Sequence, residues 1–187
     1  MATAKDILLD CPIIAAVKND SDLEEALRSE CSIIFLLYGN LVTIEDLVQK
    51  VRRQKKLAIV HMDLIDGFSS REIAVDGLVK LCRPDGIIST RAAQIRRGRQ
   101  LGLLTVQRAF ILDSLSLESL GSQLEAGHPD FVEILPGIMP RIIREITAKI
   151  SVPLIAGGLI QYKQEVLQAI DAGAVAVSTT CRDVWKM

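Results

Sequence analysis

Aromatic side chains are scarce in this sequence, since phenylalanine, tyrosine and tryptophan make up 4% of its 187 residues. A core must therefore be built from aliphatic residues, which dominate the hydrophobic fraction of 49%. Such a composition suits parallel strands that are covered on both faces. Charge of one sign is not in excess either, because the formal net charge is -1. An overall basic field is thus excluded, and any nucleic-acid contact requires a local patch.

Long hydrophobic runs are also missing, and no stretch approaches the roughly 18 apolar residues that a membrane span requires. Residues 1–6 contain no basic stretch followed by an apolar run, so no secretory leader is expected. The cysteines lack the CxxC spacing of zinc and redox sites. We therefore expect reduced thiols in a cytoplasmic protein that uses neither a metal nor a cofactor. The cysteines are Cys11, Cys31, Cys82 and Cys181.

The sequence does contain a regular alternation of short apolar runs and longer segments of helical period. The runs are aliphatic or β-branched throughout, as expected for buried parallel strands. Capping-box spacing at Ser21 and at Ser69 marks the start of two of the helices. The predicted strands span residues 13–17, 33–37, 57–60, 86–89, 103–106, 131–135, 154–156 and 175–178. The predicted helices span residues 21–29, 44–54, 70–81, 91–101, 116–125, 140–149 and 163–172.

Repeated strand–helix units leave two architectures open, a doubly wound sheet and a closed barrel. Eight units favour closure, because a barrel leaves no unpaired strand edge. We therefore predict an α/β fold, a compact single-domain (β/α)8 TIM-type barrel over residues 1–187. Residues 181–187 have room for only one or two turns, so the last helix is truncated. The wall that it leaves exposed hints at a partner subunit, and hence a homo-oligomer.

The strongest functional signal lies in the last two units, IAGGL followed by VSTT. In this fold, phosphate sites use the loops after the seventh and eighth strands. Gly157 and Gly158 allow the backbone to approach an oxyanion, while Ser178 and Thr179 add hydroxyl donors. These residues predict a phosphate cradle. The alternative is a tight turn followed by a helix cap.

Charged residues end several other strands, at the face where such barrels hold their ligands. Lys18 and Arg108 supply positive charge that complements a phosphate, and Asp63 and Glu133 supply acceptors for ligand hydroxyls. Mutual salt bridges across the barrel mouth are the structural alternative. Gly137 belongs to a turn after the sixth strand and can touch a ligand through its backbone.

Two basic clusters, RRQKK and RRGR, fall near helix C-termini, where positive charge interacts favourably with the helix dipole. A contact surface for RNA phosphates is the functional alternative. His61 lies at the third strand and is expected to be a satisfied interior histidine. No histidine has a nucleophile at catalytic spacing, and no metal cluster can be drawn. The basic residues concerned are Arg52, Arg53, Lys55, Lys56, Arg96, Arg97 and Arg99.

Six segments in series resemble the glycerol uptake operon antiterminator regulatory protein family: HMDLIDG, DGIIST, QRAFILDS, VEILPG, IAGGLI and AVSTT. The resemblance covers nearly the whole chain. It implies a bacterial regulator that binds leader mRNA of glycerol-utilisation genes and prevents premature termination in response to glycerol 3-phosphate. By this likeness we expect the phosphate on the four cradle residues, with Asp63, Arg108 and Glu133 nearer the glycerol part. No RNA-binding motif is implied.

A barrel enzyme, a lyase or isomerase acting on a triose or sugar phosphate, is the competing interpretation. Lys18 would then be an electrophile or an amine nucleophile, and Asp63 or Glu133 a general acid or base. No activated pair of nucleophile and base is visible in the sequence. We therefore predict a regulator and no catalytic residues.

Overall fold

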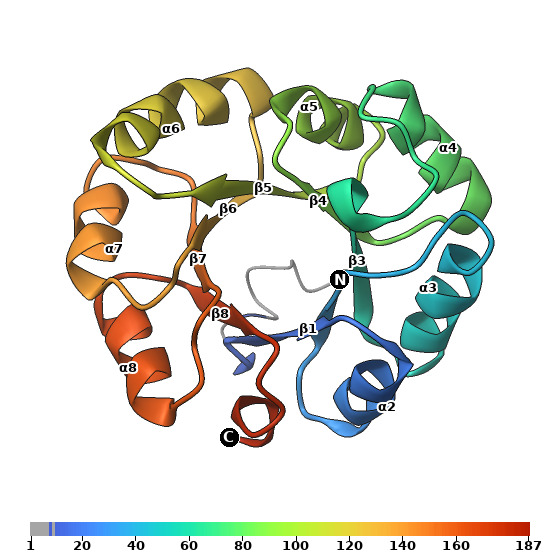
Figure 1. The fold of residues 1–187 in the computed structure, drawn as a ribbon, viewed down its shortest axis with the longest axis horizontal. Coiled ribbons are helices and arrows are strands. Elements are labelled where there is room, and N and C mark those ends of the chain that lie inside the picture. Colours follow the sequence, from blue (N-terminus) through green and yellow to red (C-terminus); the bar gives the residue numbers. More distant parts are fainter. Residues whose placement is uncertain (1–7, 9) are drawn as a thin grey trace.

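Eight parallel strands close into a barrel in chain order in the computed structural model, which describes residue 8 and residues 10–187 (Figure 1). This confirms the predicted (β/α)8 barrel. The expectation about a secretory leader concerns residues 1–6, which lie outside the described residues. The strands are β1 (Ile13–Val17), β2 (Ile33–Leu36), β3 (Leu57–His61), β4 (Gly86–Ser89), β5 (Leu104–Phe110), β6 (Phe131–Leu135), β7 (Leu154–Gly157) and β8 (Ala176–Thr179).

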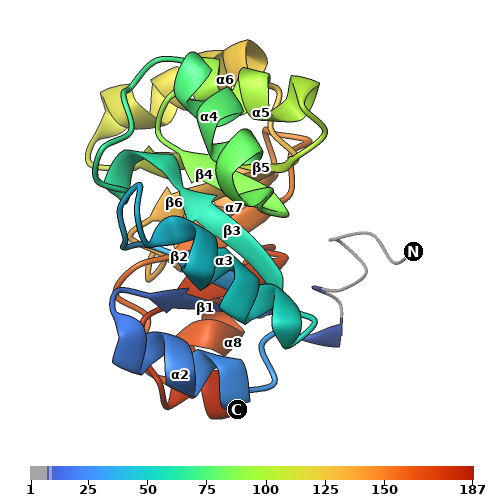
Figure 2. The same ribbon diagram turned by 90° about the vertical axis from the view of Figure 1, so that its right-hand side faces the viewer.

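Helices follow the first seven strands and form the outer layer of the molecule (Figure 1). Figure 2 shows the barrel from the side, with helices outside the slanted strand β3. A short 3-10 helix, η1 (Met62–Leu64), follows β3 directly. The α-helices are α2 (Asp20–Arg28), α3 (Ile44–Arg53), α4 (Ile73–Cys82), α5 (Ala92–Gln100), α6 (Ser114–Gly127), α7 (Pro140–Thr147) and α8 (Lys163–Asp171).

Two hydrophobic layers hold the barrel together. The larger one lies between the strands and the helices, and the smaller one fills the barrel interior. The interior is aliphatic apart from two phenylalanines, Phe35 and Phe131. Because successive strand residues point to opposite faces, residues two positions beyond these interior residues point into the barrel mouth. The interior residues of the strands are Ile14, Ala16, Ile33, Phe35, Ile59, Ile88, Val106, Phe131, Ile155 and Ala176.

Two local predictions are wrong. Strand β5 continues to Phe110, well beyond the predicted end at residue 106. The polar residues Gln107 and Arg108 are buried within β5 because the tertiary structure supplies their partners, which periodicity alone cannot indicate. Neither predicted capping box forms either, since α2 is capped by Asn19 and α4 begins only at Ile73 without a side-chain cap.

The C-terminal segment covers the wall that the sequence left bare. A 3-10 helix, η2 (Val184–Lys186), lies between α8 and α2 (Figure 1). Its Trp185 is buried, and the indole Nε1 donates to the Thr179 carbonyl at 2.8 Å. The exposed wall that hinted at a partner subunit is therefore not found. The Trp185 side chain thus covers the part of the barrel wall that a full eighth helix would cover.

None of the helices within the described residues combines the length and apolar character needed to cross a membrane.

Candidate functional site

A cavity of about 960 Å³ opens at the carboxyl ends of the strands. Among the predicted site residues, six line it: Lys18, Arg108, Glu133, Gly158, Ser178 and Thr179. Asp63, Gly137 and Gly157 do not belong to its lining. The lining also contains Leu159 and Thr180, which stand in the IAGGL and VSTT segments but were not predicted as site residues. Sequence reasoning missed the apolar wall of the cavity, which includes Leu37, Leu64, Phe110, Leu112 and Leu135.

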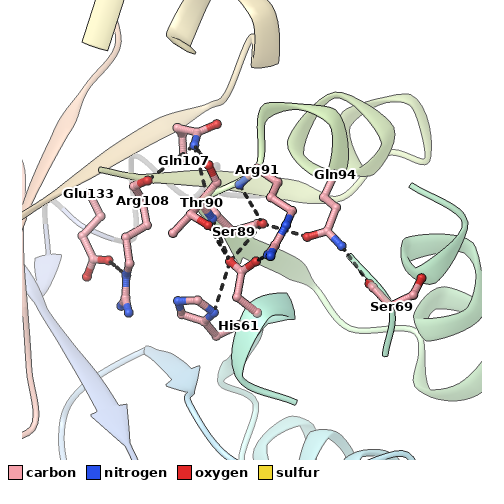
Figure 3. A network of polar contacts seen from close by, with 10 residues as sticks. His61, Ser69, Ser89, Thr90, Arg91, Gln94, Gln107, Arg108 and Glu133 are labelled. Carbon is pink, nitrogen blue, oxygen red and sulfur yellow. Dashed lines mark hydrogen bonds and ion pairs between the residues drawn. The ribbon is translucent and has the colours of Figure 1, made fainter. Parts of the chain in front are cut away.

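A buried ion pair forms the floor of the cavity. Arg108 Nε donates to Glu133 Oε2 at 2.5 Å, and Glu133 is fully buried. The second carboxylate oxygen accepts a hydrogen bond from the Ser178 hydroxyl. Glu133 thus has both oxygens engaged by the protein, whereas the remaining nitrogens of Arg108 point away from it (Figure 3). The predicted salt bridge across the mouth exists between these two strands.

Two glycines among the predicted site residues, Gly157 of the cradle and Gly137 of the turn after β6, have packing reasons to be glycine. A Cβ at Gly157 would lie 2.6 Å from a carboxylate oxygen of Glu133 and 2.9 Å from the Ser178 hydroxyl. A Cβ at Gly137 would lie 2.9 Å from the backbone of residues 156 and 157. Both positions therefore allow close approach within the protein, and neither faces the cavity.

The loop after β7 has an unusual backbone. Gly158 and Leu159 both adopt left-handed conformations, with φ of 76° and 63°. For leucine this region is uncommon and costs conformational energy. Among the described residues, nothing accepts a hydrogen bond from the backbone N–H of Leu159 or of Thr180. Consecutive left-handed or turn residues with free N–H groups form a concavity suited to anions.

The hydroxyl groups predicted to serve a phosphate are already engaged. Ser178 donates to Glu133, and Thr179 Oγ1 donates to the Ile160 carbonyl at 2.6 Å while accepting from the Cys181 N–H. Thr180 and Lys18, by contrast, are exposed at the cavity. Around the loops after β7 and β8, the donors that remain for a ligand are therefore backbone N–H groups, the Thr180 hydroxyl and the Lys18 ammonium group.

Asp63 is the centre of a separate polar network, which includes Ser89, Thr90 and Arg91. These three partners are labelled in Figure 3. Its Oδ2 accepts from the Thr90 N–H at 2.8 Å and from the Ser89 hydroxyl at 3.1 Å, and its other oxygen pairs with Arg91. The same Ser89 hydroxyl lies 2.8 Å from Gln94 Oε1, so its single proton is shared between these two acceptors. These contacts tie η1 to the start of α5. The side chain is thus occupied by the protein rather than presented to the cavity.

His61 lies between this network and the cavity floor. The residue is 2% exposed, and its Nδ1 has no hydrogen-bond partner among the described residues. Nδ1 is 3.8 Å from Asp63 Oδ2, beyond hydrogen-bond range. Burial, and secondarily the charge of Arg108, lower the pKa of His61 to about 3. The expectation of a satisfied interior histidine is wrong, because this imidazole is neutral and incompletely bonded.

The basic cluster on α5 is neutralised by neighbouring carboxylates. Each of its arginines forms an ion pair, and the guanidinium of Arg97 uses two nitrogens on Asp76. That contact lowers the pKa of the Asp76 carboxyl. The pairs are Arg96–Glu72, Arg97–Asp76 and Arg99–Asp130.

The cluster at the end of α3 is only partly engaged. Arg52 donates to a backbone carbonyl at 3.0 Å, and Lys56 donates to two others at 2.5 and 2.8 Å. Arg53 and Lys55 are exposed, and no described residue forms a hydrogen bond or ion pair with either side chain. These two residues are the cations of the predicted clusters that remain available to a partner.

Across residues 8 and 10–187, no group of three or more histidine, cysteine, aspartate or glutamate side chains is placed to hold a metal ion.

Comparison with known proteins gives a consistent result. Residues 13–185 match the family model described as "Glycerol-3-phosphate responsive antiterminator". The chain is 42% identical to the uncharacterized protein YgcP of Escherichia coli K12, over 97% of this chain and 95% of that protein.

Solved structures agree with the family match. A glycerol uptake operon antiterminator regulatory protein from Listeria monocytogenes is 34% identical, with a TM-score of 0.91 over 94% of this chain and 95% of that one. An antiterminator-related protein from Thermotoga maritima is 29% identical, with a TM-score of 0.82 over 94% and 98%. An aldolase at 13% identity and a TM-score of 0.71, covering 95% of this chain and 92% of its own, shares the fold alone.

Proposed function

The chain belongs to the glycerol-3-phosphate responsive antiterminator family, and from this we propose that it binds glycerol 3-phosphate at the barrel mouth. In response it binds leader mRNA of glycerol-utilisation genes and prevents premature termination of transcription. Acting on nascent transcripts, it works in the cytoplasm.

The phosphate binds at the loops after β7 and β8. The observation that supports this position is the left-handed pair Gly158–Leu159, which leaves N–H groups free beside the free N–H of Thr180. Such N–H groups suit an oxyanion. Lys18, exposed on the neighbouring strand end of the same cavity, adds the positive charge that a phosphate dianion requires.

The glycerol part points across the mouth toward Arg108. The guanidinium has nitrogens left over from its pair with Glu133, and it lines the same cavity. Glu133 itself is enclosed by Arg108 and Ser178, so it positions the arginine and does not contact the ligand. A carboxylate directly against the phosphate would repel it, so the enclosure of Glu133 by protein donors is compatible with an anionic ligand.

Calorimetry with glycerol 3-phosphate tests the site. Lys18→Gln removes one charged partner of the phosphate, and hydrogen bonds to charged groups contribute about 1.5–3 kcal/mol. We expect its affinity to fall by about tenfold or more. Lys163→Gln is the matched control, because Lys163 is an exposed lysine at the start of α8 that does not line the cavity. An equal effect of both changes would contradict the proposed phosphate position.

The RNA contact lies at the end of α3. Arg53 and Lys55 are free to contact RNA phosphates, whereas the arginines of α5 are engaged in ion pairs. Helices of this fold run opposite to the strands, so α3 ends at the face away from the ligand cavity. Ligand and RNA therefore communicate through the barrel, and the ligand must bind the RNA-competent state more tightly to shift it.

A gel-shift series tests this surface. Arg53→Ala combined with Lys55→Ala should weaken binding of leader RNA and reduce its salt dependence. Arg96→Ala combined with Arg97→Ala removes the same number of charges from paired positions and should have the smaller effect. The reverse order would move the RNA surface to α5.

The enzymatic alternative, a lyase or isomerase, is checked in the same samples. Both oxygens of the Glu133 carboxylate are held by protein donors, which does not favour a base poised for proton transfer. Glycerol 3-phosphate incubated with the protein should stay unchanged in a 31P NMR spectrum. A new phosphorus resonance would favour the enzyme.

A further inference from the structure

One side of the cavity is apolar and open to solvent. Large hydrophobic residues at or just after the ends of three neighbouring strands, β5, β6 and β7, line this side (Figure 1). We call them the apolar strip: Phe110, Leu112, Leu135 and Leu159. Leu112 is 81% exposed and Leu159 is 65% exposed. Exposed apolar side chains that gather around a cavity mark a place where another apolar group binds.

The strip lies one level nearer to solvent than the buried ion pair of the cavity floor. Phe110 and Leu135 follow Arg108 and Glu133 by two positions, so each side chain points to the same face of the sheet as the charged residue before it. Phe110 and Leu135 are also register partners in the β5–β6 pair. An apolar level thus follows the polar level directly.

The strip is continuous with the proposed phosphate loop. Leu159 belongs to the left-handed pair of that loop. A Cβ built on Gly158 would lie 3.0 Å from Cδ2 of Leu135, so the Leu135 side chain packs against the same loop. A phosphate on this loop, with the rest of its ligand directed toward Arg108, therefore has the apolar strip beside it.

Glycerol 3-phosphate fills only the polar part of this cavity. The volume of about 960 Å³ is at the upper end of pockets that enclose drug-sized ligands, which are much larger than glycerol 3-phosphate. Every carbon of glycerol 3-phosphate carries an oxygen atom, so the molecule offers little hydrocarbon surface to the strip. Removal of apolar surface from water favours binding. A ligand that matches both parts of the cavity therefore has a phosphate at one end and a hydrocarbon group at the other.

We infer that the cavity also binds glycerol phosphates that carry a single acyl or alkyl chain, with the chain on the apolar strip. The chain is attached through a glycerol oxygen, near Arg108, and runs over Phe110, Leu135 and Leu112 toward solvent. This inference rests on the proposed function, because the phosphate and the glycerol keep the positions assigned there. It adds esters and ethers of glycerol phosphate to the ligands of the same site.

Calorimetry with matched ligands tests the chain position. Glycerol 3-phosphate and its monohexanoyl ester have the same phosphate group, and only the ester has a hydrocarbon chain. Each buried methylene group raises affinity by about fourfold. Burial of two or more should therefore make the ester bind about tenfold more tightly or better. Hexanoylglycerol, which has the chain without the phosphate, should bind more weakly than the ester, because the phosphate loop holds the other end of the ligand.

A pair of leucine variants locates the chain. The quantity to compare is the ratio of the affinity for the ester to the affinity for glycerol 3-phosphate. Leu112→Ser shortens the apolar strip and should reduce this ratio by about threefold or more. Leu115→Ser is the matched control, because Leu115 is 71% exposed in the first turn of α6 and does not line the cavity. It should leave the ratio unchanged.

The outcomes separate this inference from the proposed function. An ester that binds no more tightly than glycerol 3-phosphate, or an equal effect of the two leucine variants, would overturn the inference and leave the glycerol 3-phosphate site standing. A wild-type protein that binds neither ligand would overturn both.

Size-exclusion chromatography tests whether a second copy of the chain covers the strip instead. A wild-type dimer that Leu112→Ser dissociates, and that the ester does not dissociate, would assign the strip to a subunit interface and overturn the inference. We expect the elution volumes of the wild type and of Leu112→Ser to be the same.

Discussion

Replacing Arg108 tests the ion pair at the floor of the cavity. Arg108→Met leaves the fully buried Glu133 carboxylate with a single protein donor, the Ser178 hydroxyl. Removing one partner of a buried pair costs about 3–5 kcal/mol, because an uncompensated charge stays behind. For a chain of this size, each kcal/mol lowers the melting temperature by roughly 2–4 °C. We expect a loss of roughly 6–20 °C.

A double variant tests whether the cost of Arg108→Met comes from the charge that is left unpaired on Glu133. Arg108→Met combined with Glu133→Leu replaces both charges by apolar groups, which is often neutral or stabilising for a buried pair. Its stability should therefore return close to that of the wild type. Glycerol 3-phosphate binding should not return, because the guanidinium that lines the cavity is still missing. Stability and ligand binding are thus predicted to separate in one molecule.

Urea denaturation of the wild type, the single variants and the double variant gives the coupling free energy directly. A double variant that is no more stable than Arg108→Met would refute the reasoning. The stability lost in Arg108→Met would then come from lost side-chain packing and not from an unpaired charge on Glu133.

Three further predictions follow from other parts of the structure. Gly158→Asp should abolish glycerol 3-phosphate binding in calorimetry, whereas Gly158→Ala, which shares the strain of a left-handed φ of 76° without the charge, should retain more of it. The pKa of His61 falls from 6.5 to about 3 on folding, so the unfolded chain binds one more proton than the folded protein between these pH values. The free energy of unfolding should therefore decrease by up to about 1.4 kcal/mol per pH unit as the pH falls below 6.5. His61→Leu should remove that pH dependence in urea titrations. A hydrogen bond with Cys31 lowers the pKa of Cys11 to about 6, while burial raises the pKa of Cys82 to about 12. Because the thiolate is the reactive form, iodoacetamide at neutral pH should label Cys11 well before Cys82, which peptide mapping can follow.

The barrel was predictable because its signal is repeated and local. Every strand contains an apolar run, and segments of helical period alternate with these runs, so eight units reinforce one another even where single boundaries shift. The strand ends carry the charged residues, and parallel strands bring their carboxyl ends to one face. Lys18, Arg108, Glu133 and Gly158 could therefore be assigned to the mouth before their contacts were known.

The division of roles at the mouth was not predictable. Asp63 and Glu133 have the same chemistry at equivalent strand ends, yet Asp63 belongs to the network at the start of α5 and Glu133 to the cavity floor. Ser178 and Thr179 were expected to hold a phosphate, but each donates to the protein. The acceptor of the Ser178 hydroxyl is 45 residues away in the chain, and that of the Thr179 hydroxyl is 19 residues away. Local sequence patterns cannot indicate partners at such separations.

Sequence alone thus determined the strand order, the buried aliphatic layers and the face that carries the site, because these depend on periodicity and composition. Only the tertiary structure decided which polar groups have partners. It made Gly157 a packing residue, covered the last strand with Trp185, and left the N–H groups of the phosphate loops and the imidazole of His61 unbonded. The physical reason is that a hydrogen bond is satisfied by groups close in space, and closing the barrel sets those distances.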